Sequence, residues 1–253
     1  MTRQPSSPQF PDFFVSADWS KDARKRSVHV ADLSARRIHR PEDSDWTLRA
    51  LLHLAAELAQ RGSVLVGIDA ALGVPPGYWR AVQKWDWGIR GRPANFIDWL
   101  SRLAPDSTFF EDVRESDEWD VSRPFFRVPG RPGGLSDFTN LFDDGFRRRI
   151  DRLTGAKPLF AVSGIPGTVG SGTRALWKEL IPQLQWKRDF AVWPFEGDLP
   201  ELLTRSRIVL AETYPGLAYA AALGDTLPAG QRRVAKTRPE PRRRACNALE
   251  AMP

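Results

Sequence analysis

The chain has 253 residues and a mass of 28.5 kDa, with 42% hydrophobic residues, 27% charged residues and a net charge of +6. This composition is typical of a soluble globular protein with one large domain or two small ones. The single cysteine, Cys246, excludes an internal disulfide and a cysteine zinc site, and no apolar run is long enough for a signal peptide or for the roughly 18 residues of a membrane span. We therefore expect a cytoplasmic protein without a membrane partner, and its basic charge favours an acidic partner such as nucleic acid.

The first part of the chain predicts an arm, a hairpin and a helix. Residues 1–11 are rich in proline, serine and threonine, which indicates a flexible arm. Two apolar, β-branched runs at 13–20 and 27–33 flank a charged connection and predict antiparallel strands. Leucines and alanines at helical spacing predict a helix over 47–62, with Asp45 as its N-cap and Gly62 at its end.

The rest of the chain predicts an α/β domain with an insertion. Residues 63–79 begin as a continuous apolar run, the pattern of a strand covered on both faces, and end in a loop rich in glycine and proline. The irregular, tryptophan-rich segment from 80 to about 157 is interpreted as an insertion. Strand and helix patterns then alternate over 158–164, 173–184, 189–195, 206–215 and 217–223. Together these patterns predict one domain over 12–253.

Three of the predicted strands end in a carboxylate, at Asp18, Asp69 and Glu212. In an α/β sheet, ligands bind outside the carboxyl ends of the strands, so acids on neighbouring strands can converge on one point. Convergent carboxylates are typical ligands of a hard cation such as Mg²⁺ or Mn²⁺. The alternative is that each acid begins a turn or caps the next helix.

The surrounding motifs are more specific than the acids alone. They are GIDAALGVP at 67–75, AETYPG at 211–216 and the basic stretch AKTRPEPRRR at 235–244, which follow Asp18 in this order. On these residues the chain resembles the family of predicted RNase H-like nucleases of microbes. Ala71 stands where that family usually has proline, and the segment 80–157 is longer than expected for it.

This resemblance implies an RNase H-like fold, in which a mixed five-stranded sheet with three antiparallel opening strands is flanked by helices. It also implies that Asp18 and Asp69 are the central ligands of Mg²⁺ or Mn²⁺, with Glu212 as a third ligand. Lys236 would contact a phosphate or the substrate. The implied activity is in-line hydrolysis of a phosphodiester with two metal ions.

RNase H-like nucleases usually place a last acid on a C-terminal helix, and here only Glu250 is available for that place. We expect the natural chain to continue past Pro253. The alternatives are that Glu250 fills this place or that the site is incomplete.

Two further segments are candidate nucleic-acid contacts. Residues 232–244 contain seven basic residues and one acid, so they form either a phosphate-binding strip or a solvated connector. The residues expected to bind nucleic acid there are Arg232, Arg233, Arg238, Arg242, Arg243 and Arg244. Five tryptophans between 79 and 119 alternate with basic residues. They predict either a stacking platform for single-stranded bases or packing of the insertion against the domain.

Three hypotheses follow from the sequence. The first is a metal-dependent nuclease acting on nucleic acid, and the second is a non-catalytic module of the same fold that binds nucleic acid or a protein partner. The third is a phosphotransferase of the actin and sugar-kinase superfamily. It is disfavoured because no matched pair of glycine-rich phosphate loops follows Asp18 and Asp69.

Overall fold

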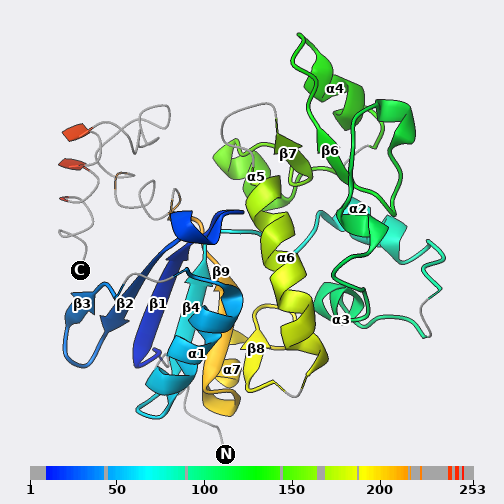
Figure 1. Cartoon of the computed structure of the whole chain (residues 1–253). Helices are drawn as coiled ribbons and strands as arrows, with labels where there is room; N and C mark the ends of the chain where they lie inside the picture. Colours follow the sequence, from blue (N-terminus) through cyan, green and yellow to red (C-terminus); the bar gives the residue numbers. More distant parts are fainter. Residues whose placement is uncertain are drawn as a thin grey trace, which may run out of the picture. The chain divides into compact units, whose positions relative to one another are not determined.

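A computed structural model (Figure 1) describes residues 10–42, 45–88, 91–142, 145–163, 169–186 and 188–215, together with residues 217, 223, 239, 240, 243, 244 and 247. The chain divides into two compact units, Met1–Glu212 and Thr213–Pro253. All strands described below belong to the first unit. The predicted arm over 1–11 and the predicted segment over 217–223 lie almost entirely outside the described residues.

The first unit contains two sheets. The larger sheet has six strands in the order β3-β2-β1-β4-β9-β8, one strand more than expected. Its strands are β1 (Phe13–Asp18), β2 (Ser27–Asp32), β3 (Arg37–His39), β4 (Val64–Ile68), β8 (Phe190–Val192) and β9 (Ile208–Glu212). β1, β2 and β3 are antiparallel to one another, whereas β4 and β9 run parallel to β1 and β8 runs parallel to β9. The pattern predicted at 189–195 contains the short edge strand β8, whereas β3 was not predicted from a sequence pattern.

The smaller sheet is parallel and has the order β5-β6-β7, from β5 (Asp112–Val113), β6 (Phe125–Arg127) and β7 (Ala161–Ser163). It lies in the segment between β4 and the helix α6 (Gly170–Gln185), and this segment includes the predicted insertion. The strand expected at 158–164 is present as β7, but it pairs with β6 and not with the larger sheet. The segment therefore has a sheet of its own.

Helices cover both faces of the larger sheet. The α-helices are α1 (Leu48–Ala59), α2 (Pro76–Val82), α3 (Phe96–Ser101), α4 (Gly134–Thr139), α5 (Arg149–Thr154), α6 (Gly170–Gln185) and α7 (Leu199–Arg205). Helix α1 packs on the face that carries Val64, Val66 and Leu210, and α7 packs on the opposite face, against Leu65 and Val209. The strand β4 is thus covered on both faces, as its continuous apolar sequence predicted.

The predicted helix at 47–62 is confirmed, but its N-cap is different. The Thr47 hydroxyl accepts the Ala50 N–H at 3.1 Å, whereas Asp45 lies two residues earlier and its carbonyl accepts the Thr47 N–H. A capping side chain reaches the free amides of the first turn from the residue directly before the helix. Thr47 occupies that position, so the expectation for Asp45 was wrong.

Helix α6 joins the two sheets into one core. It contacts α1, α3 of the insertion and the strand β7 that follows the insertion, as Figure 1 shows by its central position. Its Trp177 is fully buried, and the ring centroid lies 5.0 Å from that of Phe96 and 5.9 Å from that of Phe125. Aromatic packing of this kind fixes the insertion on the domain.

Candidate functional site at the carboxyl ends of the parallel strands

The structure places the three predicted acids at the same edge of the larger sheet. Asp18 ends β1, Asp69 directly follows β4 and Glu212 ends β9, and these three strands are neighbours in the order β1-β4-β9. Ala17 pairs in register with Ile68, and the Asp69 N–H donates to the Ala17 carbonyl at 2.9 Å. Asp18 and Asp69 therefore occupy the same register position on adjacent parallel strands.

Glu212 lies one register position earlier than Asp69. It pairs with Ile68, so strand alternation directs it to the α1 face of the sheet, whereas Asp18 lies on the face of Phe14 and Ser16. Asp18 is exposed and Asp69 is half-buried. The edge therefore carries two acids at one level and a third acid on the other side of the sheet.

Glu212 is bound by a residue of the insertion. Arg148 directly precedes α5, and its Nη1 lies 2.8 Å from Oε1 and 2.6 Å from Oε2 of Glu212. The same guanidinium pairs with the fully buried Asp151, with Nη2 2.8 Å from Oδ1. Burial raises the pKa of the Glu212 carboxyl, and the charge of Arg148 opposes this shift.

The loop after Asp69 is held from two sides. The Leu72 N–H donates to Glu212 Oε2 at 3.1 Å. From α6, the buried Thr173 hydroxyl accepts the Ala71 N–H at 3.2 Å, and the Trp177 indole N–H donates to the Ala71 carbonyl at 2.8 Å. Side chains of β9 and α6 thus fix the backbone that follows Asp69.

The chain around Asp18 is fixed as well. The next residue, Trp19, is buried, and the guanidinium of Arg26 lies 3.7 Å from its ring centroid. Arg26 is itself buried and pairs with Glu179 of α6 at 2.8 Å. Asp18 and Asp69 therefore both lie at the ends of well-packed strands. Rigid packing of this kind is a requirement for a preorganised site.

Two of the three acids at this edge of the sheet have carboxylate oxygens suited to bind a hard divalent cation. Asp18 and Asp69 offer carboxylate oxygens, which Mg²⁺ and Mn²⁺ prefer, and Mg²⁺ is commonly held by one or two protein carboxylates with water completing its shell. Both oxygens of Glu212 face Arg148 instead. Across the described part of the chain, no group of three histidine, cysteine or acidic residues is arranged to hold a metal ion.

Most of the predicted phosphate contacts lie outside the described residues. These are Lys236 and Arg232, Arg233, Arg238 and Arg242, and Glu250 lies there too. Arg243 and Arg244 are described and are exposed, and Arg243 Nη2 lies 3.8 Å from Glu240 Oε2. An exposed pair at this distance contributes little to stability.

The tryptophans of the insertion mostly pack the core. Trp99 is 1% exposed, and Trp79, Trp87 and Trp119 pack against the same core cluster. Trp85 differs because 42% of its surface is exposed. A continuous platform of five rings is therefore not formed, and the packing interpretation holds for four of the five.

Arg148 and Thr173 were not predicted from the sequence. Arg148 stands in the middle of three consecutive arginines, so its sequence context does not distinguish it from Arg147 or Arg149. Thr173 lies in the first turn of a helix, where threonine is common. Only long-range contacts single these residues out.

Comparison of the chain with protein-family models, with curated proteins and with solved structures gives no match in any of the three. None of the helices within the described ranges is long and apolar enough to cross a membrane. The function must therefore be argued from the site itself.

Proposed function

We propose that the chain is a metal-dependent phosphodiester hydrolase that acts on nucleic acid, with Asp18 and Asp69 as ligands of Mg²⁺ or Mn²⁺. The observation that carries this proposal is the position of the two acids at one register level of adjacent parallel strands. Carboxyl ends of parallel strands are the usual place for ligands in α/β sheets. Carboxylate oxygens are the ligands that Mg²⁺ and Mn²⁺ prefer, and one or two protein carboxylates commonly hold Mg²⁺.

The architecture of the larger sheet supports an RNase H-like fold for this chain. Three antiparallel strands open the sheet, and β4 then adds in parallel beside β1. The acids proposed as central ligands, Asp18 at the end of β1 and Asp69 directly after β4, are those that the resemblance implied. The sixth strand and the second sheet are additions to that plan.

Each residue has a distinct role in this proposal. Asp18 and Asp69 would hold the cation, which when bound activates water and stabilises charge on the phosphoryl and leaving oxygens. Glu212 is a positioning residue, because it accepts from the Leu72 N–H in the loop that follows Asp69. Lys236 and the basic residues over 232–244 would bind backbone phosphates of the substrate.

The proposal is tested by cleavage of labelled single-stranded and double-stranded DNA and RNA in Mg²⁺, in Mn²⁺ and in EDTA. We expect cleavage only with a metal ion. Asp18→Asn and Asp69→Asn should each lower the rate about a hundredfold or more, because metal stabilisation of transition-state charge is worth several kcal/mol. The matched control is Asp106→Asn, in an exposed loop away from the sheet edge, and it should cleave like wild type.

Binding of Mn²⁺ measured by calorimetry provides an independent readout. Asp69→Asn should weaken it, and a wild-type circular dichroism spectrum should show that the metal-free variant is folded. Cleavage that persists in EDTA, or that survives both aspartate substitutions, would overturn the proposal.

A second candidate is a non-catalytic module that binds nucleic acid or a protein partner on the same fold. The ion pair between Glu212 and Arg148 favours it, because this pair removes one of the three acids from the edge. Nucleic-acid binding that is equal in Mn²⁺ and EDTA, without cleavage of any substrate, would establish this candidate over the first.

A further inference from the structure

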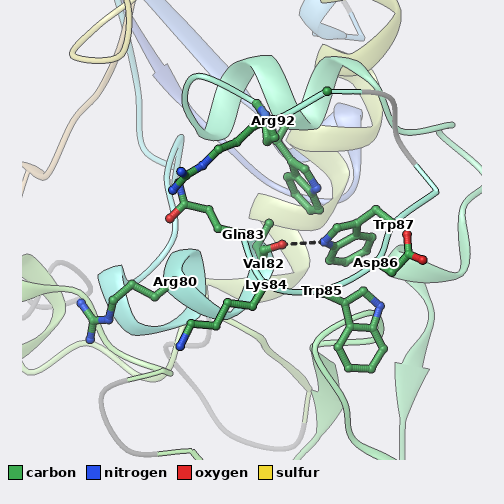
Figure 2. Close-up of a pocket in the computed structure, with 11 residues that line it drawn as sticks. Arg80, Val82, Gln83, Lys84, Trp85, Asp86, Trp87 and Arg92 are labelled. Atoms are coloured by element: carbon green, nitrogen blue, oxygen red, sulfur yellow. Dashed lines mark hydrogen bonds between the residues drawn. The ribbon is translucent and has the colours of Figure 1, made fainter.

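The insertion contains a pocket of about 480 Å³ that is separate from the acids at the sheet edge. It lies between the C-terminal end of α2 and the chain that leads into α3, as Figure 2 shows. A pocket of this volume is within the usual range for small-molecule sites, roughly 300 to 1,000 Å³. Its walls combine exposed cations with tryptophan rings, namely Arg80, Lys84, Arg92, Trp85, Trp87 and Trp99.

The aromatic wall is built on rigid packing. The Trp87 indole N–H donates to the Val82 carbonyl at 2.9 Å, and its ring meets Trp99 edge-on with centroids 4.9 Å apart. Trp85 is neither buried nor stacked in this way, and 42% of its surface is open to solvent. An exposed tryptophan at the mouth of a pocket offers a free ring face for stacking.

The cationic wall is formed by Arg80, Lys84 and Arg92. Arg80 and Lys84 are four residues apart, and the Trp85 N–H bond to the Ala81 carbonyl continues the helical turn, so both project from one side. Figure 2 shows these three side chains extending to one side of the pocket, with Trp85 and Trp87 on the other. All three cations are exposed, and none has an acidic partner within the described ranges.

One acid, Asp86, also lines the pocket, so three cations and one acid leave a net charge of +2 among the described lining residues. Asp86 Oδ1 accepts the Gly88 N–H at 2.9 Å. At the other side of the pocket, Arg102 pairs with Asp98 at 2.7 Å and donates to the Gly91 carbonyl at 3.1 Å. The described lining therefore stays positive.

Trp99 supports the aromatic wall from inside the core. It is 1% exposed, and its ring meets that of Phe109 edge-on with centroids 5.1 Å apart. The pocket thus offers a free ring face at Trp85 and three cations.

We propose that this pocket binds one nucleotide unit, with the base stacked on Trp85 and the phosphate held by Arg80, Lys84 and Arg92. A purely apolar ligand would leave the cations unused, and inorganic phosphate would leave the ring unused. A nucleotide uses both. Binding here needs neither a metal ion nor the acids at the sheet edge, so it is independent of hydrolysis.

The same chemistry is found in a free mononucleotide and in one nucleotide of a single strand. The test therefore measures binding of a labelled single-stranded oligonucleotide by fluorescence anisotropy, and of a mononucleotide by calorimetry, both in EDTA. Trp85→Ala should weaken binding about tenfold or more, because stacking of a base on an aromatic ring has that value. Trp85→Phe should retain most of the affinity, since it keeps an aromatic face.

The controls match each change. Trp186→Ala removes a tryptophan that is 78% exposed and lies outside the pocket, and it should bind like wild type. The pair Lys84→Ala and Arg92→Ala should lower affinity and flatten its salt dependence by up to about two phosphate contacts. The pair Arg37→Ala and Arg49→Ala removes the same charge from exposed positions on β3 and α1 and should leave the salt slope in place.

The outcomes separate this inference from the proposed hydrolase. Asp69→Asn should lose cleavage and keep Trp85-dependent binding. Mononucleotide binding that depends on Trp85 would identify a free nucleotide as a ligand, and oligonucleotide binding alone would identify a strand. Equal affinities of wild type, Trp85→Ala and the Lys84→Ala, Arg92→Ala pair for both probes would overturn the inference.

Discussion

Arg148 contacts both carboxylate oxygens of Glu212, at 2.8 and 2.6 Å, across 64 residues of sequence. The pair connects the insertion, which carries Arg148, to the last strand of the larger sheet. Since Glu212 also accepts from the Leu72 N–H, one ion pair links α5, β9 and the loop after Asp69. Arg148 is therefore a candidate for the position at the sheet edge where a single substitution lowers the stability of the protein most.

Replacement of Arg148 by alanine should lower the free energy of unfolding by about 3–5 kcal/mol, because it removes one charged partner from two buried carboxylates at once. Asp151 is fully buried and Glu212 is mostly buried. Urea denaturation measures the loss. The neighbouring Arg147→Ala is the control: Arg147 is exposed, so its replacement should change stability by no more than about 0.5 kcal/mol. A loss below about 1 kcal/mol in Arg148→Ala would show that the pair is no stronger than a surface salt bridge.

The free energy of unfolding should change with pH because of the Glu212 carboxyl. Its pKa is raised by burial, so the folded protein binds more protons at this site than the unfolded chain. The contribution of the Glu212 carboxyl to the free energy of unfolding is therefore fully present below the ordinary glutamate pKa of about 4.3. It is lost as the pH rises through the pKa that this carboxyl has in the folded protein. We expect the stability of wild type relative to Glu212→Gln to fall over that window in urea unfolding. Glu201→Gln, at an exposed position on α7, provides the baseline, and a relative stability that rises with pH would contradict the assignment.

Thr173→Val tests how the loop after Asp69 is held. The buried hydroxyl accepts the Ala71 N–H, and valine has the same shape without an acceptor. An unsatisfied buried N–H costs about 1–3 kcal/mol, so thermal or urea unfolding should show a loss of that size. Thr204→Val removes an exposed hydroxyl on α7 and should lie within about 0.5 kcal/mol of wild type. Equal stability of both variants would mean that water replaces the hydroxyl at Ala71.

The basic residues at 242–244 test whether the strip over 232–244 contacts phosphates. Replacing Arg242, Arg243 and Arg244 with alanine should weaken nucleic-acid binding and flatten the slope of log affinity against log salt by about 0.7–0.9 for each lost contact. Asp69→Asn should leave this slope unchanged in EDTA, because it removes no phosphate contact. A triple variant with the wild-type slope would identify the strip as a solvated connector.

The sequence alone predicted the elements whose patterns are local. Two apolar, β-branched runs predicted the β1–β2 hairpin, helical spacing predicted α1, and a continuous apolar run predicted β4 as a strand covered on both faces. It also placed Asp18, Asp69 and Glu212 at strand ends, because an acid that follows an apolar run marks the point where a strand leaves the core. Which strands become neighbours is not a local property, and only the tertiary structure put β9 between β4 and β8.

Only the folded chain decided what these side chains contact. Glu212 pairs with an arginine from the insertion and Thr173 holds the loop after Asp69, and both contacts join residues more than sixty positions apart. Four of the five tryptophans lie in the core or pack against it and one stayed exposed, because the four rings meet one another or phenylalanines such as Phe96, Phe109 and Phe146, contacts that composition does not reveal. Local periodicity depends on neighbours along the chain, whereas pairing, burial and unpaired donors depend on neighbours in space.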